Sequence, residues 1–182
     1  MSEMFSRRVF LRGLGVVAAA AALTACSSTN EAVNQALIEG AVGGIVAADC
    51  KIGRMTYWAA NATVPVYEIS FRIVMTNVSS KPVTLSGDNF ATTLDGTPIP
   101  PFNFSARDVG DADIWRTYDS LTIRPGEERS VALAYEISQP TYDSWYRSSR
   151  TVAVSFTCGN QCVTYTKNSR SDEITVSDIE TL

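Results

Sequence analysis

At residues 66–77 the chain carries the stretch VYEISFRIVMTN, in which apolar and polar side chains alternate over the whole length. A period of two is typical of a β-strand, because successive side chains of a strand point to opposite faces of the sheet. The stretch therefore predicts a strand that is buried on one face only, as in antiparallel sheets that cover a core. The apolar side chains are Tyr67, Ile69, Phe71, Ile73 and Met75, and the polar ones include Glu68, Ser70 and Arg72.

The chain after this stretch also consists of short predicted strands separated by turns. Residues 78–82, VSSKP, predict a turn, and so do Asp95-Gly96 and Pro125-Gly126. Residues 108–119 are expected to form a loop, and residues 139–150 a crossover with a helical turn. Further strands are predicted at residues 83–85, 90–94, 121–124, 131–137, 152–158 and 162–166. The prolines make residues 97–104 an edge strand or an irregular segment, and residues 174–176 are the candidate for a final edge strand. Seven or eight short strands at this spacing indicate an all-β fold, an antiparallel β-sandwich of immunoglobulin type.

The first 26 residues have the three zones of an export signal: arginines, an apolar run at 14–23, and small residues before a cysteine. The apolar run is shorter than the roughly 20 residues of a membrane-spanning helix. Arg7 and Arg8, followed by Phe10 and Leu11, resemble the twin-arginine signal, and Leu23-Thr24-Ala25-Cys26 resembles the bacterial lipobox. These resemblances imply export in the folded state, cleavage before Cys26 and attachment of diacylglycerol to its thiol.

The leader divides the chain into three parts. We expect residues 1–25 to be a signal peptide, residues 26–50 a lipidated tether, and residues 51–182 the sandwich. Ser28 and Glu31 have the spacing of a helix capping box, so a short helix is predicted after the lipobox. The acyl chains would form a covalent anchor on the extracytoplasmic face of a bacterial membrane, and no cofactor is predicted.

Three stretches resemble a family of small, mostly uncharacterised immunoglobulin-like domains that follow the leaders of bacterial lipoproteins. They are residues 71–82 (FRIVMTNVSSKP), residues 94–96 (LDG) and residues 123–137, which begin IRPGE. Together with the strands between them they cover about half of the chain. The family has no established catalytic residues, so the resemblance implies a fold and a location and assigns no site.

Charge and composition exclude several function classes. The formal net charge is −4, which disfavours nucleic acid as a partner because phosphate backbones attract basic proteins. The chain contains no histidine, and this removes Ser-His-Asp and Cys-His catalysis together with the commonest general base. We therefore predict that the protein is not an enzyme.

Besides Cys26 the chain has three cysteines. Cys158 and Cys162 flank Gly159-Asn160-Gln161, which we expect to be a three-residue hairpin loop, and they are the candidate disulfide pair. A bridge from Cys50 to one of the two is the alternative. No metal site is predicted from the cysteines, since structural zinc takes four Cys or His ligands.

Two further groups of residues are candidates for binding. Exposed aromatics near an arginine suit a protein or glycan partner, but aromatics in a crossover can also close the open end of the core, which is the interpretation we favour. These residues are Trp115, Tyr142, Trp145, Tyr146 and Arg147. Asp108, Asp111 and Asp113 are a weak calcium candidate in a loop that is more typical of a solvated acidic surface.

The function predicted from sequence is a non-enzymatic binding or interaction module, displayed at the cell envelope by its lipid anchor to a protein or glycan partner. One alternative is an accessory subunit that packs against a membrane complex through residues 36–48, where Gly40 and Gly44 have the spacing of helix contact motifs. Another is a calcium-type ligand carrier that uses residues 108–113.

Overall fold

The structure is a computed structural model that describes residues 40–57, 63–101, 103–109 and 115–182. The leader, Cys26 and the helix predicted after it lie outside the described residues. No helix in the described part is long and apolar enough to cross a membrane.

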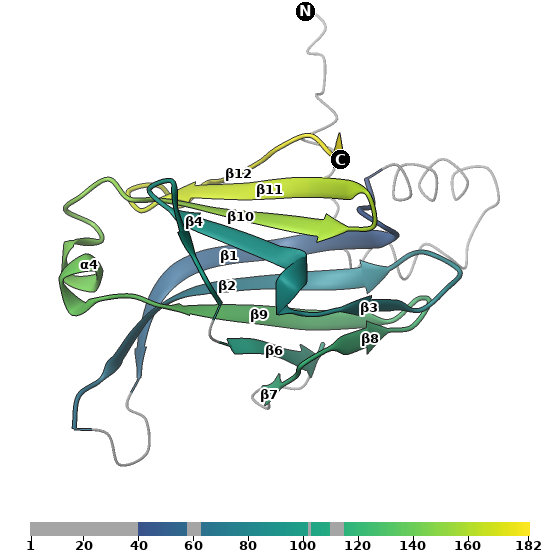
Figure 1. The fold of residues 1–182 in the computed structure, drawn as a ribbon, viewed down its shortest axis with the longest axis horizontal. Helices are drawn as coiled ribbons and strands as arrows, with labels where there is room; N and C mark the ends of the chain where they lie inside the picture. The colour runs from purple at the N-terminus through teal and green to yellow at the C-terminus, as the bar shows by residue number, and fades with distance from the viewer. Residues whose placement is uncertain (1–39, 58–62, 102, 110–114) are drawn as a thin grey trace, which may run out of the picture. The chain divides into compact units, whose positions relative to one another are not determined.

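Two antiparallel sheets form the two layers of a sandwich (Figure 1). The first has the order β1 (Ile45–Tyr57), β2 (Val66–Asn77), β9 (Glu128–Glu136), β6 (Asn103–Asp108) and β7 (Arg116–Thr117). The second has the order β12 (Ile174–Val176), β11 (Gln161–Asn168), β10 (Thr151–Cys158), β4 (Phe90–Leu94) and β5 (Thr97–Ile99), with β13 (Glu180–Thr181) also on β11. The remaining elements are the pair β3 (Val83–Leu85) and β8 (Leu121–Ile123), the 3-10 turn η1 (Gly87–Asn89) and the helix α4 (Gln139–Ser144).

The predicted all-β antiparallel sandwich is confirmed. The described part contains seven strands of five residues or more, namely β1, β2, β4, β6, β9, β10 and β11. Lettered A to G in chain order, they form the sheets A-B-E-D and C-F-G, which is the strand order of immunoglobulin domains. The short segments explain why there are more strands than the seven or eight expected.

The alternation in β2 has the predicted consequence. Its apolar residues Ile69, Phe71, Ile73 and Met75 are at most 2% exposed and face the second sheet. Phe71 contacts Phe90 and Tyr165, with ring centroids 6.1 and 5.8 Å apart, so the two layers meet through aromatic side chains. The polar residues of β2 consequently lie on the outer face of the first sheet.

The sandwich begins earlier than predicted. The compact unit starts at Ala41 and the first strand at Ile45, whereas the sequence predicted a tether up to residue 50. Ala41, Val42, Ile45 and Val46 are all buried, so this half of segment 36–48 packs into its own domain. Ala47 and Ala48 are half-buried, and residues 36–39 lie outside the described residues, so the accessory-subunit alternative stays a prediction.

Two glycines make this early start possible. Gly43 and Gly44 have φ values of +58° and +85° and form a two-residue turn, closed by two backbone hydrogen bonds between Val42 and Ile45. The amide of Gly43 also donates to the side-chain carbonyl of Gln161 on β11 at 2.9 Å. The turn directs β1 along the edge of the first sheet and attaches it to the β10–β11 hairpin.

Most turns and connections lie at the positions predicted from the sequence. Asp95-Gly96 links β4 to β5 with positive φ at both residues, and β5 is an edge strand, as expected from Pro98. The crossover between β9 and β10 contains the helical turn α4. The predicted loop 108–119 differs, because Asp108 ends β6 and Arg116–Thr117 form β7 on its edge.

Candidate functional site

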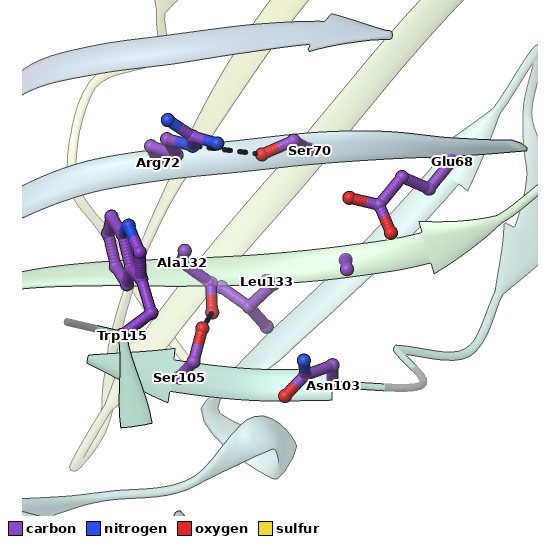
Figure 2. Close-up of a pocket in the computed structure, with 9 residues that line it drawn as sticks. Glu68, Ser70, Arg72, Asn103, Ser105, Trp115, Ala132 and Leu133 are labelled. Atoms are coloured by element: carbon purple, nitrogen blue, oxygen red, sulfur yellow. Dashed lines mark hydrogen bonds between the residues drawn. The ribbon is translucent and has the colours of Figure 1, made fainter. Parts of the chain in front are cut away.

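A groove of about 180 Å³ lies on the outer face of the first sheet (Figure 2). It follows the central strand β9, whose outward residues Ala132 and Ala134 are small, while the flanking strands β2 and β6 carry longer side chains. The lining residues are Glu68, Ser70, Arg72, Asn103, Ser105, Trp115, Ala132, Leu133 and Ala134. A strip of alanine between two polar strands is thus the physical origin of the groove.

Glu68 is the most unusual residue of the groove. It is 5% exposed although it belongs to the outer face, and its carboxylate makes no hydrogen bond or ion pair with the described residues. Burial raises the pKa of Glu68 more than the positive charge of Arg72 lowers it. The residue is thus largely removed from solvent, whereas its carboxylate oxygens, which make no hydrogen bond with the described residues, stay open to the groove, where a donor or a cation can reach them.

Arg72 and Trp115 occupy the other end of the groove, as Figure 2 shows. The Arg72 guanidinium donates to Ser70 Oγ at 3.3 Å and to Met55 Sδ at 3.0 Å, and it lies 5.5 Å from the Trp115 ring centroid. None of these groups is an anion. Within the described residues the Arg72 side chain therefore has no carboxylate partner, and its charge is available to a ligand.

The middle of the groove supplies neutral hydrogen-bonding groups. Asn103 and Ser105 on β6 face Ser70 across the alanine floor, because Ser70, Ala134 and Asn103 are aligned in register across three strands. Ser105 Oγ donates to the Ala132 carbonyl at 3.4 Å, and the Asn103 side-chain oxygen accepts from Thr117 at 3.3 Å. The arrangement can bind a small polar ligand at several points.

The aromatic residues predicted for binding separate into two places. Trp145 is 2% exposed and belongs to the core, so its assignment to a partner surface was wrong. Tyr142 packs against Tyr67 with centroids 4.9 Å apart, and Arg54 lies 4.3 Å from the Tyr142 centroid and 4.6 Å from that of Tyr146. These side chains cover one end of the core, which is the structural interpretation favoured from sequence.

Of the remaining partner-binding candidates, Tyr146 and Arg147 are exposed beside α4. Trp115 instead lines the groove above β6 and β9. Of the five candidates, Trp115 is the one that lines the groove described above.

The predicted disulfide between Cys158 and Cys162 is wrong. The hairpin loop has two residues, Gly159 and Asn160, and Cys158 pairs with Gln161 while Cys162 pairs with Thr157. Because neighbours on a strand point to opposite faces, Cys158 points toward the core side and Cys162 toward the outside. Cys50, Cys158 and Cys162 are all free thiols, so the alternative bridge from Cys50 is also absent among the described residues.

Asp108 does not join a calcium site in the described structure. Its carboxylate forms an ion pair with Arg129, which also binds Glu127. Asp111 and Asp113 lie outside the described residues, as do Arg7, Arg8, Phe10, Leu11 and Cys26.

The groove residues were missed at the sequence level, although a signal was present. Glu68, Ser70 and Arg72 were assigned to the outward face of a strand, but such residues are usually solvated and attract no attention. Ala132 and Ala134 stand at the outward positions of residues 131–137, where a strand normally carries longer polar side chains. Small residues on an outer face are the feature that predicts a depression there.

The strand order defines the class of protein as an all-β immunoglobulin-like sandwich. No protein-family model matches the chain, and no curated protein matches it.

Several solved structures are similar to the chain. An uncharacterised β-sandwich protein from Clostridium difficile is 16% identical, with 68% of this chain and 83% of that chain covered and a TM-score of 0.41. The yjhA protein of Bacillus subtilis is 15% identical, covering 62% and 73%, with a TM-score of 0.38. A functionally unknown protein from Listeria monocytogenes is 13% identical, covering 70% and 82%, with a TM-score of 0.34.

Proposed function

We propose that this protein is a lipoprotein of the bacterial cell envelope that is anchored through Cys26 and binds a small polar ligand without transforming it. The ligand site is the groove over β9. The leader supports the location, because the twin-arginine and lipobox patterns occur in the expected order before the domain. Anchoring by acyl chains fits a domain whose described residues include no spanning helix.

The observation that carries the binding role is Glu68, a largely buried residue whose carboxylate opens into the groove and makes no hydrogen bond or ion pair among the described residues. Folding alone gains nothing from such a charge, since an amide or an apolar side chain in the same place would be less costly. Residues that oppose stability in this way are typical of binding sites, where the ligand supplies the missing partner.

The absence of catalysis is supported by the chemistry of the lining. Among the described residues that line the groove Glu68 is the one acidic residue, whereas glycoside hydrolysis uses two carboxylates. The chain has no histidine to act as a base, and no lining residue is a cysteine. The side chains present can bind and orient a ligand, which is the role proposed for them.

The binding role is tested by the variant Glu68→Gln, with Glu180→Gln as control, because Glu180 is an exposed carboxylate on β13. If Glu68 serves a ligand, the empty Glu68→Gln protein should be more stable than the parent by about 1 kcal/mol. Urea unfolding measures the difference. A loss of stability in Glu68→Gln would contradict the proposal, since it would give Glu68 a structural role.

The anchor is tested by labelling cells with a radioactive fatty acid. The parent chain should take up label and sediment with membranes, whereas Cys26→Ser should do neither. Cys162→Ser, which changes an outward thiol of the sandwich, should behave like the parent. Equal labelling of Cys26→Ser and the parent would refute the lipid anchor and leave the groove unaffected.

A further inference from the structure

The two ends of the groove have opposite charge. Glu68 and Arg72 are four residues apart on β2, so their Cα atoms are about 13 Å apart at 3.3 Å per residue. Arg72 leans back toward Ser70, as its 3.3 Å hydrogen bond shows, and the guanidinium is therefore closer to Glu68 than the backbone spacing implies. Coulombic attraction to Arg72 also reaches the Glu68 carboxylate.

The dimensions of the groove limit the ligand. The floor is one strand wide between β2 and β6, which are about 10 Å apart because two strand spacings separate them. A cavity of about 180 Å³ is smaller than the roughly 300 Å³ at which sites for drug-sized molecules begin. The ligand, or the part of it that enters, is therefore short and narrow.

Trp115 does not offer a free stacking surface for a sugar ring. Its ring centroid lies 5.5 Å from the Arg72 guanidinium carbon and 4.9 Å from that of Arg107. Cations near an aromatic face are held by the ring's charge distribution, so Trp115 positions the basic end of the groove. This favours a ligand with an anionic group over one that needs an aromatic platform.

We propose that the groove binds a short zwitterionic peptide of two or three residues, with its ammonium group at Glu68 and its carboxylate at Arg72. This inference rests on the proposed binding function and names the class of ligand. An extended peptide of three residues spans about 10 Å, somewhat less than the about 13 Å between the Cα atoms of Glu68 and Arg72, and the Arg72 guanidinium leans toward Glu68. Its backbone amides would lie over Ala132 and Ala134, within reach of the polar groups of Ser70, Asn103 and Ser105.

The test uses the full-length chain in mild detergent and isothermal titration calorimetry with four probes at millimolar concentrations. The probes are trialanine, N-acetyl-trialanine, trialanine amide, and the neutral disaccharide of N-acetylglucosamine. Trialanine should bind, and blocking either terminus should weaken binding about tenfold or more, because a charge in the groove then loses its partner.

Variants assign each terminus to its end of the groove. In Glu68→Gln, trialanine should bind about tenfold more weakly while the N-acetylated peptide is unchanged; in Arg72→Gln, the same should hold for the amidated peptide. Glu180→Gln should bind all probes like the parent. Equal affinity of the three peptides would overturn the proposal.

The remaining outcomes distinguish failure of the peptide ligand from failure of the groove as a binding site. Binding of the disaccharide alone, lost in Glu68→Gln, would overturn the peptide ligand and keep the groove as a binding site. Binding of no probe to the parent would overturn the peptide proposal, and the proposed function would fail as well if Glu68→Gln were then also less stable than the parent.

Discussion

Asn77 shows how much a single buried polar residue can organise. It is 0% exposed, and its side-chain amide donates to the carbonyls of Lys81 and Ile123, each at 2.8 Å. Its side-chain oxygen accepts from the Ser79 amide at 2.9 Å and from the Ser79 hydroxyl at 2.7 Å. Asn77 thereby joins the turn after β2 to the end of β8, two segments 46 residues apart in the chain.

We predict that Asn77→Ala lowers the free energy of unfolding by about 3 kcal/mol, because it leaves several buried groups without partners at once. Urea unfolding at neutral pH measures the loss. Asn168→Ala serves as control, since the Asn168 side chain makes an exposed hydrogen bond to Ser149. A loss in Asn77→Ala no larger than in the control would show that the network contributes little.

The cysteines differ in their accessibility. Burial raises the pKa of the Cys50 thiol to about 12 and that of Cys158 above its usual range. Cys162 points outward from β11. In the folded protein at pH 8, iodoacetamide should therefore modify Cys162 first and leave Cys50 unmodified until the chain unfolds.

Mass spectrometry of peptides from the alkylated protein checks this order. A peptide that contains Cys158 and Cys162 but is two hydrogens lighter than the dithiol would contradict it, because that mass indicates the disulfide. The faces of the two residues make that bond incompatible with the hairpin as it is paired.

At the scale of elements, the turn before β1 depends on glycine for two reasons. The φ of Gly43 is +58°, and a Cβ there would lie 2.7 Å from the Cβ of Cys158 and 2.9 Å from its carbonyl oxygen. The turn is thus packed directly against the start of the β10–β11 hairpin. Only a residue without a side chain allows this approach.

Gly43→Ala should therefore destabilise the protein by at least about 2 kcal/mol, as overpacking adds to an unfavourable backbone conformation. The matched control is Gly53→Ala in β1, where an added Cβ meets nothing within 4 Å and φ is not positive. Thermal unfolding by circular dichroism compares the two variants. Equal melting temperatures would mean that the turn can move away from the hairpin without cost.

The hairpin of β10 and β11 explains why the disulfide prediction failed. The sequence predicts a three-residue loop at residues 159–161, which would place Cys158 and Cys162 opposite each other. Gly159 has φ of +62° and makes a two-residue turn, so Gln161 joins the ladder and Val163 and Tyr165 face the core without a bulge. One residue of difference in the loop reversed the face on which Cys162 lies.

For the whole molecule, we expect high pH to lower the folding stability, because one thiol and two phenol groups are buried in their protonated form. Burial raises the pKa of Cys50 and of Tyr135 to about 12 and raises that of Tyr165 further. In the unfolded chain these groups lose protons near pH 8.5 and pH 10. Because the unfolded state then binds fewer protons than the folded state, stability is complete below about pH 8.5 and falls as pH rises toward 12.

Urea midpoints at pH 7, 9 and 10.5 should therefore decrease in that order. Cys50→Ala removes one of the two buried thiols, Cys50 and Cys158, that titrate first on unfolding, so its midpoint should change less than that of the parent between pH 7 and 9, whatever its absolute stability. A urea midpoint of the parent protein that stays constant up to pH 10.5 would contradict the raised pKa values of these buried thiol and phenol groups.

The sequence alone determined the strands, most turns and the sandwich class, because alternation, prolines and the Asp95-Gly96 and Pro125-Gly126 pairs act locally. The sequence also contains the twin-arginine and lipobox patterns of the leader, and fatty-acid labelling of Cys26 tests the lipid anchor that they imply. The first strand escaped prediction, since the bulge between Ala48 and Lys51 interrupts its period and the turn glycines Gly43 and Gly44 directly precede it.

Only the tertiary structure decided where the chain has a site. The groove needs β2, β9 and β6 side by side, and these strands are far apart in sequence. It also needs the longer residues of β2 and β6 to flank the alanines of β9. Periodicity gives the face on which a side chain lies, but the strand that lies next to it depends on the packing of the two sheets. For this reason Glu68 was predicted as an outward residue, and its burial beside an unpaired Arg72 emerged only from the fold.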